Sequence, residues 1–535
     1  MKTMISSIIL ASCLALPLAS CSDSDAAPEQ KDWSTTTYFY SADAAMQDTY
    51  YKPTVGYVGD PMPFFDPMAG DFKVLYLQDF RPNPEGTYHP IWGVSTKDAA
   101  HYTSLGELVA CGTKKSQDAA IGTGSTIYDE ASKLYYTFYT GNKYLPTGDE
   151  SAQAVMVATS PDFKTWTKDR TFLLKGQDFG YDKNDFRDPF VFKGDDGKFH
   201  MLVSTKKSGK GSLAEFVSDD LKNWTDNGVF MTMMWDRFYE CPDLFKMGDY
   251  WYLVYSEIHH AVRRVQYFKG RTLDELKACT ANDAGIWPDA HEGFLDSRGL
   301  YAGKTASDGT NRYLWGWCPT RSGKDNTAVG ASPAEPEWGG NLVCYKLIQH
   351  EDGTLTLGQI DAVSEKYNQD VAVEVKESQN MTEADGTYTL AGSVEQPDAY
   401  MLMGRLGSHN RISFTVTTSN EWDKFGISMV RGSDSKKYYT MVVNPENENN
   451  RKVNFEEQGV EGKGFIAGID GYVFARPADN VYNITIYTDN SICVMYINDV
   501  CSYTNRIYGI QKNCWSIDSF NGANVKVSNL KISQY

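Results

Sequence analysis

Residues 184–192, Asn-Asp-Phe-Arg-Asp-Pro-Phe-Val-Phe, decide the interpretation of this chain. The apolar run at the end of the stretch, residues 190–192, predicts the start of a buried strand. Arg187 and Asp188 stand just before that run, and Pro189 interrupts the chain between them. Charged groups are costly to place against a hydrophobic core unless they are paired or face water. We therefore expect this strand end to face a cleft.

Two other carboxylates have the same setting. Asp60 is followed directly by proline, and Glu240 is followed by Cys-Pro, each among aromatic or apolar neighbours. Each motif alone is also typical of a simple turn before a strand, because proline and aspartate are common turn residues. Taken together, Asp60, Asp188 and Glu240 are interpreted as one acidic site. Cys241, beside the third acid, is interpreted as a small buried residue and not as a nucleophile.

The three motifs, in this order, resemble those of glycoside hydrolase family 32, the fructan hydrolases and invertases. The resemblance covers residues 50–365 well, with weaker matches at Gln78, Trp92, Ser125 and Asp296. It implies a retaining hydrolase with Asp60 as nucleophile, Glu240 as acid/base and Asp188 as stabiliser of the transition state. Retaining glycosidases use two carboxyl groups about 5–5.5 Å apart, and their transition state gathers positive charge.

Six residues are candidates for substrate binding. They are Gln78, Trp92, Ser125, Arg187, Trp235 and Asp296. The two tryptophans are candidates to hold a long chain along an open cleft, and packing within the sheets is the alternative for both.

One departure from the family pattern concerns the residue before the nucleophile. The family has asparagine there, whereas this chain has Gly59, and Met-Pro follows Pro61. The resemblance therefore loses an amide that often contacts a terminal sugar. With its lipoprotein-like N-terminus, the chain also resembles the surface endo-acting levanases of gut Bacteroides-type bacteria. This resemblance implies cleavage inside the β-2,6-linked polymer levan, with inulin and sucrose as poor substrates. The alternatives are an exo-acting fructanase, inulinase or invertase, an inverting furanosidase acting on arabinan, and a glycan-binding lipoprotein without catalysis.

The pattern of short strands predicts an all-β protein. Asp98, Asp162 and Asp220 each follow a strand, and an aromatic residue and a threonine come four and five positions after each aspartate. This unit recurs about every 60 residues, which is typical of propeller blades. Residues 49–365 have room for about five blades of four strands, and the family resemblance also implies a five-bladed β-propeller. The C-terminal region, 366–535, lacks the repeat and predicts a β-sandwich, with 366–382 expected as a connector.

The N-terminus reads as a targeting segment. Residues 1–20 form a signal sequence ending in Leu-Ala-Ser before Cys21, which resembles a bacterial lipoprotein box. We expect a lipid anchor at Cys21, a polar tether over 21–48, and location at the outer membrane facing outward. An ordinary signal peptide is the alternative.

Composition limits the partners. A net charge of −18 argues against nucleic acid, which requires basic surfaces. No phosphate loop, metal-ligand spacing or cofactor motif stands out, so no cofactor or metal is expected. Neutral glycans, here a fructan, remain as substrate, with other glycan-uptake proteins as possible partners at the membrane.

Overall fold

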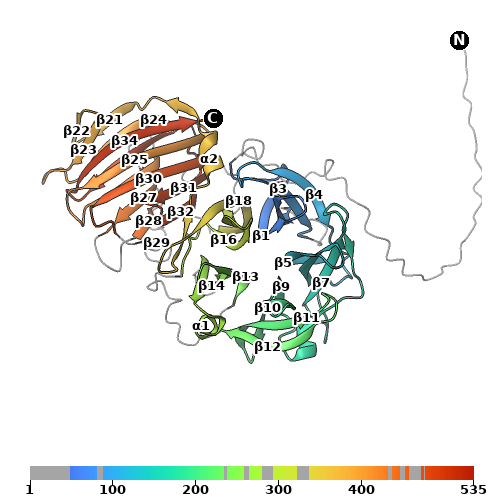
Figure 1. The fold of residues 1–535 in the computed structure, drawn as a ribbon. Helices are drawn as coiled ribbons and strands as arrows, with labels where there is room; N and C mark the ends of the chain where they lie inside the picture. Colours follow the sequence, from blue (N-terminus) through green and yellow to red (C-terminus); the bar gives the residue numbers. More distant parts are fainter. Residues whose placement is uncertain are drawn as a thin grey trace, which may run out of the picture.

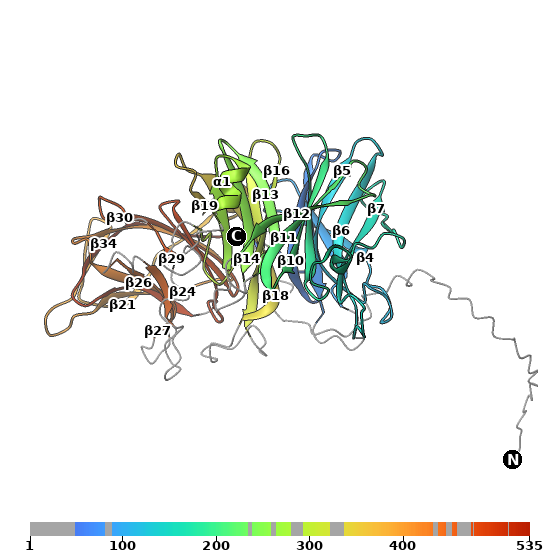
Figure 2. The same cartoon turned by 90° about the horizontal axis from the view of Figure 1, so that it is seen from below.

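The computed structural model describes residues 49–80, 88–233, 238–257, 264–279, 293–321, 336–431, 437–445, 452–456, 472–474, 476–511 and 513–535. Within these ranges nearly all regular structure is antiparallel strand, as predicted (Figures 1 and 2). The helical elements are short: η3 (Gly176–Phe179), α1 (Leu273–Ala278) and α2 (Asp361–Lys366). The described residues include no helix with the length and apolar character needed to cross a membrane.

The first nineteen strands form a propeller. Their bounds are β1 (Tyr57–Asp66), β2 (Asp71–Asp79), β3 (Ile91–Thr96), β4 (Thr103–Val109), β5 (Ala120–Asp129), β6 (Leu134–Asn142), β7 (Gln153–Ser160), β8 (Thr167–Lys168), β9 (Phe186–Lys193), β10 (Phe199–Lys207), β11 (Lys210–Ser218), β12 (Thr225–Thr232), β13 (Glu240–Met247), β14 (Tyr250–Glu257), β15 (Arg264–Gly270), β16 (Tyr301–Ser307), β17 (Arg312–Arg321), β18 (Pro336–Gln349) and β19 (Leu355–Gly358). Sheets β5–β8, β9–β12 and β13–β15 are separate, whereas β16–β19 join β1–β4 through the pair β1–β18. Figure 1 shows β1, β5, β9, β13 and β16 around a common centre.

These five central strands share a local irregularity. In each, the register against the next strand slips near the start, which marks a β-bulge. The slips fall at Asp60, Thr123, Asp188, Cys241 and Ala302, each followed by Pro or Gly. Bulges bend a strand and redirect side chains, and they are common beside active sites. The extra residue therefore takes the same place in each of the five strands, and in β9, β13 and β16 it has a positive φ, of 57°, 52° and 52°.

The predicted aspartate turn is present three times. Asp98, Asp162 and Asp220 each accept two backbone N–H groups from residues two and three positions later. The following residue has φ of 58°, 61° and 62°, respectively, and its carbonyl accepts a hydrogen bond from the aromatic side chain of Tyr102, Trp166 or Trp224. These turns lead from β3 to β4, from β7 to β8 and from β11 to β12. The sequence repeat is thus a repeat of structure.

The remaining strands form a β-sandwich. Their bounds are β20 (Gln369–Val371), β21 (Val375–Gln379), β22 (Met381–Ala384), β23 (Thr387–Ala391), β24 (Ala399–Arg405), β25 (His409–Thr418), β26 (Lys424–Arg431), β27 (Lys437–Asn444), β28 (Lys452–Glu456), β29 (Tyr472–Val473), β30 (Val481–Asp489), β31 (Ile492–Ile497), β32 (Cys501–Arg506), β33 (Cys514–Phe520) and β34 (Asn524–Gln534). One sheet has the order β22-β23-β34-β25-β30-β31-β32 with β20 on β34, and the other has β21-β24-β33-β26-β27-β28-β29. Residues of both sheets share one apolar cluster.

The connector predicted over 366–382 is wrong. This stretch contains β20 and β21 and the start of β22, which pair with β34, β24 and β23. The side chains of β20 are exposed, and those of β21 are exposed or half-buried. The alternation that usually signals a strand is short there, limited to Val371, Val373 and Val375, of which the last two pack against the core of the sandwich.

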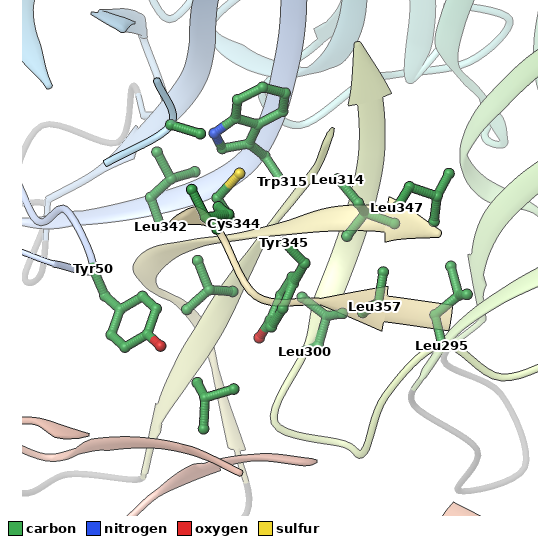
Figure 3. Packing of buried hydrophobic residues seen from close by; sticks show 14 of the residues in the cluster. Tyr50, Leu295, Leu300, Leu314, Trp315, Leu342, Cys344, Tyr345, Leu347 and Leu357 are labelled. Atoms are coloured by element: carbon green, nitrogen blue, oxygen red, sulfur yellow. The ribbon is translucent and has the colours of Figure 1, made fainter. Parts of the chain in front are cut away.

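A shared apolar cluster joins the propeller to the sandwich. Tyr345 of β18 lies in it beside Leu300 and Leu357 (Figure 3). The sandwich contributes Tyr487, Ile492, Val494 and Tyr496 to the same cluster. Burial of these apolar side chains holds the propeller and the sandwich together, since burial of apolar area is the main driving force of association.

Candidate active site

Three carboxyl groups meet where the central strands begin. Asp60 lies in the bulge of β1, Asp188 lies in that of β9, and Glu240 is the first residue of β13. The electrostatic effect of Glu240 reaches both aspartates and raises the pKa of each, although burial is the larger cause. The structure therefore brings together the three acids that the sequence singled out.

Asp60 has a donor on each carboxylate oxygen. Thr123 Oγ1 donates to Oδ2 at 2.6 Å, and Trp317 Nε1 donates to Oδ1 at 3.0 Å. Burial raises the pKa of Asp60 above its ordinary value, and these two hydrogen bonds limit the rise. The donors also fix the orientation of the carboxylate, which a nucleophile requires.

Asp188 is almost fully buried and has a left-handed backbone with φ of 57°. Its N–H donates to Thr140 Oγ1 at 2.8 Å, and its Oδ2 accepts the N–H of Cys241 at 2.9 Å. Burial raises the pKa of Asp188 from 3.8 to about 7, with Arg187 opposing the shift and Glu240 adding to it. Protonation of Glu240 removes that repulsion, so it favours the ionised form of Asp188.

Glu240 is held by two donors. Arg187 Nη2 donates to its Oε1 at 3.0 Å, and the Tyr301 hydroxyl donates to its Oε2. Arg187 also donates to Asp185 Oδ1 at 2.7 Å and lies 3.9 Å from the centre of the Phe238 ring. Burial alone would lower the pKa of Arg187. The carboxylates around it, Glu240 above all, outweigh burial, so its pKa lies above the ordinary value for arginine. The guanidinium is therefore a fixed positive charge in the site.

A buried lysine also lies beside the acids. Lys304 of β16 donates from Nζ to the carbonyl oxygen of Gly124 at 2.8 Å. Burial lowers the pKa of Lys304, whereas the neighbouring Cys241, Asp243, Asp188 and Asp60 raise it. Cys241 is itself buried, and burial raises the pKa of its thiol well above the ordinary range. The thiol stays protonated, in agreement with the structural role predicted for it.

Hydrogen bonds run from one aspartate to the other. The N–H of Asp188 donates to Thr140 Oγ1, Thr140 Oγ1 donates to the carbonyl oxygen of Thr123 at 2.9 Å, and Thr123 Oγ1 donates to Asp60. A parallel link joins Asp60 to Glu240, because their donors Trp317 and Tyr301 are paired in register with ring centroids 5.5 Å apart. The relative positions of the three acids are thus set by neighbouring side chains.

The space beside Gly59 is occupied. A Cβ atom at this position would lie 2.2 Å from the Trp338 ring. The same indole is stacked on His89, with ring centroids 4.1 Å apart, and Trp317 lies next to it at 6.1 Å. The side chain that is missing at position 59, where the family has asparagine, therefore leaves no gap, because the indole of Trp338 fills the space beside Gly59.

Of the six candidates for substrate binding, Arg187 contacts the acids. Gln78 is buried on β2, where its Nε2 donates to the carbonyl oxygen of Val55 at 2.5 Å, while its Oε1 has no hydrogen-bond partner among the described residues. Trp92 on β3 packs against Phe80, with ring centroids 6.0 Å apart.

Ser125 lies beside the acids in a structural role, whereas Asp296 lies at a distance from them in the fold. The Ser125 hydroxyl donates to the carbonyl oxygen of Pro189 and accepts the N–H of Val191, which ties β5 to β9. Asp296 lies at the junction with the sandwich, where it accepts hydrogen bonds from β32. Trp235 falls outside the described residues. Among the described residues, no group of three or more His, Cys, Asp or Glu side chains is placed to hold a metal ion.

Sequence reasoning did not single out four residues of the site: Thr140, Tyr301, Trp317 and Trp338. Thr123 stands two residues before the candidate Ser125 and was given no role. A signal for Thr123 exists in hindsight, since Thr-Gly occupies the bulge of β5 as Asp-Pro occupies those of β1 and β9. Nothing in the local sequence marks the other four.

Asp188→Asn is expected to change the pH dependence of stability. Because the folded pKa of about 7 lies above the ordinary 3.8, the folded state holds an extra proton between these values, and stability falls as pH rises through them. Removing this group should raise the melting temperature relative to wild type at pH 8 but not near pH 4. The gain at pH 8 is up to about 4 kcal/mol. Calorimetry at both pH values measures it.

Asp185→Asn is the matched control for this experiment. It removes the same charge from the next carboxylate along the chain, but ion pairs with Arg187 and Lys206 outweigh burial and lower the pKa of Asp185. At pH 8, Asp185→Asn should therefore have a lower melting temperature than wild type. Equal melting temperatures of wild type and Asp188→Asn at pH 8 would contradict the argument.

Comparison with known proteins identifies the family of this chain. The model of the glycosyl hydrolases family 32 N-terminal domain matches residues 50–360, and a model described as "GH32, BT1760-like, C-terminal domain" matches residues 353–532. An insoluble isoenzyme of beta-fructofuranosidase from Arabidopsis thaliana is 27% identical over 310 residues, 52% of this chain. The chain spans half, 50%, of the length of that relative.

Solved structures agree in fold. Fructan 1-exohydrolase IIa from Cichorium intybus has a TM-score of 0.69 at 16% identity, covering 93% of this chain and 98% of its own. Sucrose-6-phosphate hydrolase from Lactobacillus gasseri has a TM-score of 0.66 at 18% identity, covering 92% and 95%. The fold is therefore a β-propeller followed by a β-sandwich. Since the first family model alone spans more than half of the 535 residues, the chain belongs to glycoside hydrolase family 32.

Proposed function

We propose that this protein hydrolyses β-fructofuranosidic bonds of a fructan with net retention. The observation that carries the proposal is the different environment of two acids that share one site. Asp60 accepts hydrogen bonds from the neutral donors Thr123 and Trp317, whereas Glu240 is held by Arg187 and Tyr301. Separate environments of this kind let two carboxyl groups take different roles in one reaction.

The reaction has two steps. The Asp60 carboxylate attacks the anomeric carbon, the bond to the leaving oxygen breaks, and Glu240 donates its proton to that oxygen. Glu240 then removes a proton from water, the water oxygen attacks the same carbon, and the bond to Asp60 breaks. Asp188, in its ionised form, stabilises the positive charge that develops on the sugar ring in both steps.

We further propose that the propeller has five blades, covering residues 49–365, and that the sandwich covers 366–535. The support is the shared bulge in β1, β5, β9, β13 and β16. On this view the sheet joining β16–β19 to β1–β4 is two blades, linked by the single pair of Val58 and Gly340.

The proposed substrate is levan, cut at internal β-2,6 bonds. In support, Gly59 offers no side-chain amide to hold a terminal sugar, and the Trp338 ring lies there instead. Sugar rings pack their apolar faces on aromatic rings, and such packing suits a chain that continues past the site.

The early product profile tests this substrate. Wild type, with Asp60→Asn as the inactive control, is incubated with levan, inulin, sucrose and arabinan, and products are separated within the first few per cent of reaction. A spread of oligosaccharides from levan is expected, with slow turnover of the other three. Free fructose alone at all times would exclude the endo mode. Faster cleavage of inulin would exclude the linkage, and cleavage of arabinan alone would favour the inverting furanosidase.

We also propose that the chain is an exported lipoprotein anchored at Cys21, facing outward and working beside glycan-uptake proteins. The signal sequence over 1–20 and the tether over 21–48 lie outside the described residues, so the support is the lipobox-like sequence alone. Mass spectrometry of the mature N-terminus is the test, and an unmodified Cys21 would refute the anchor.

A further inference from the structure

One sandwich strand contacts the propeller at two places beside a hairpin whose side chains donate hydrogen bonds to the acids. Both places lie at the open end of that hairpin. The hairpin is β16–β17, whose residues Tyr301 and Trp317 donate to Glu240 and Asp60. The sandwich strand is β32. Its contacts fall just before Tyr301 and just after Trp317, so they lie directly beside the two donor residues in the chain.

The contact before Tyr301 is centred on Asp296. This buried carboxylate accepts the N–H of Thr504 at 2.8 Å, the hydroxyl of Thr504 at 2.8 Å and the hydroxyl of Ser502 at 2.9 Å. Ser297 Oγ donates in return to the carbonyl oxygen of Thr504 at 2.5 Å. Thr504 therefore uses its N–H, its hydroxyl and its carbonyl on this one segment.

The same segment is pressed against β32. A Cβ atom at Gly299 would lie 2.0 Å from the carbonyl oxygen of Thr504, so no side chain fits there. Thr504 Oγ1 is also 2.5 Å from the Tyr345 hydroxyl of β18. Because Gly299 is two residues from Tyr301, a shift at this contact moves the start of β16.

The contact after Trp317 is made by Arg506, which is 1% exposed. Its Nη2 donates to the carbonyl oxygen of Cys318 at 2.9 Å and to Asn341 Oδ1 at 2.7 Å, and its Nε donates to the carbonyl oxygen of Pro319 at 3.1 Å. Its Nη1 donates to Ser491 of the sandwich at 2.9 Å. One side chain thus joins β17 and β18 directly beyond Trp317.

We propose that β32 is a clamp through which the sandwich positions Tyr301 and Trp317, and with them Glu240 and Asp60. The residues that act in this way are Asp296, Thr504 and Arg506, which are positioning residues because they act through the two aromatic donors. This inference rests on the proposed function, in which Asp60 and Glu240 react with the substrate.

The chemistry of the junction favours positioning over adhesion. The apolar cluster shared by the two parts already provides adhesion. Buried charged groups add little net stability, because the cost of removing them from water offsets their attraction. Hydrogen bonds have narrow requirements of distance and angle, so a buried polar junction fixes geometry in a way that apolar packing does not. Catalysis depends on such placement, since a displacement of about 1 Å can reduce the rate about a hundredfold.

Thr504→Val is the test variant. It keeps the shape and the backbone contacts of residue 504 but removes the hydroxyl that donates to Asp296. Thr356→Val is the matched control: it removes another threonine hydroxyl at the junction, which donates to the carbonyl oxygen of Asp499 at 3.1 Å from β19. Thr504→Ser restores the hydroxyl and is the conservative rescue.

We expect Thr504→Val to lower kcat on levan about tenfold or more with KM changed less than about threefold, because the donors act on the reacting groups. Thr356→Val and Thr504→Ser should stay within about twofold of wild type. Arg506→Met should lose more activity than Thr504→Val. If Thr356→Val loses as much kcat as Thr504→Val, or if Thr504→Ser restores nothing, the clamp is refuted.

Hydrogen exchange followed by mass spectrometry gives a second readout that needs no activity. Amides of 301–304 and 317–318 should exchange faster in Thr504→Val than in wild type, and at the wild-type rate in Thr356→Val. Unchanged exchange in Thr504→Val would refute the clamp. Failure of the proposed function is seen separately, as a wild type that cleaves no fructan while this difference in exchange remains.

Discussion

Asp60→Asn is expected to lower kcat on a fructan by at least about 10⁴-fold without unfolding the protein, since loss of a covalent nucleophile has effects of this order. The amide has the shape of the carboxylate, and its oxygen can still accept from Trp317 Nε1. It cannot attack the anomeric carbon, so no glycosyl-enzyme forms. Initial rates on levan, with a melting curve for each protein, measure the effect.

Thr123→Val is the graded control. It leaves the nucleophile in place and removes the 2.6 Å donor to Oδ2. Loss of one hydrogen bond to a charged group is worth about 1.5–3 kcal/mol, so the rate should fall by about 10- to 100-fold. Should folded Asp60→Asn keep more than a tenth of the wild-type rate, or lose no more than Thr123→Val, Asp60 is not the nucleophile.

Much of the fold could be predicted from the sequence because its signals are local. The turn that follows β3, β7 and β11 is a feature of a few neighbouring residues around Asp98, Asp162 and Asp220. The acids were recognisable for the same reason, as proline follows each of the two aspartates within the bulge. Local chemistry of this kind is visible without knowing what the segment packs against.

The partners of the acids could not be predicted, because they come from other strands of the propeller, far away in the sequence. Trp317 donates to Asp60 across 257 residues of sequence, and Tyr301 donates to Glu240 across 61. Trp338 lies over Gly59 because β18 pairs with β1. The contacts of Trp317 and Trp338 become visible only after the last strands have been placed beside the first.

Asp296 illustrates the opposite case. It matches the family pattern and stands five residues before Tyr301, which made it a reasonable candidate for the site. Its carboxylate is instead satisfied by Ser502 and Thr504 of the sandwich, more than 200 residues away. A motif near an active site can therefore belong to the support of that site, and the sequence alone does not separate the two roles.

Glu240→Ala is expected to show a loss that depends on the leaving group. On levan the rate should fall by about 10²- to 10⁴-fold, which is the usual contribution of a general acid. On a fructosyl fluoride the first step should lose far less, because fluoride leaves without a proton. Azide should then replace water in the second step, since the azide ion needs no base to remove a proton.

The azide product decides the mechanism as well as the residue. Because the azide attacks the sugar bound to Asp60, the fructosyl azide should have the configuration of the substrate. Tyr301→Phe is the control, because it removes one donor to Glu240 but leaves the acid. Its loss of rate should be similar on levan and on the fructosyl fluoride, and azide should not change it. Equal losses of Glu240→Ala on both substrates, with no effect of azide, would assign the acid/base role elsewhere. An azide product of opposite configuration would replace the covalent role of Asp60 with activation of water, and with it the retaining mechanism.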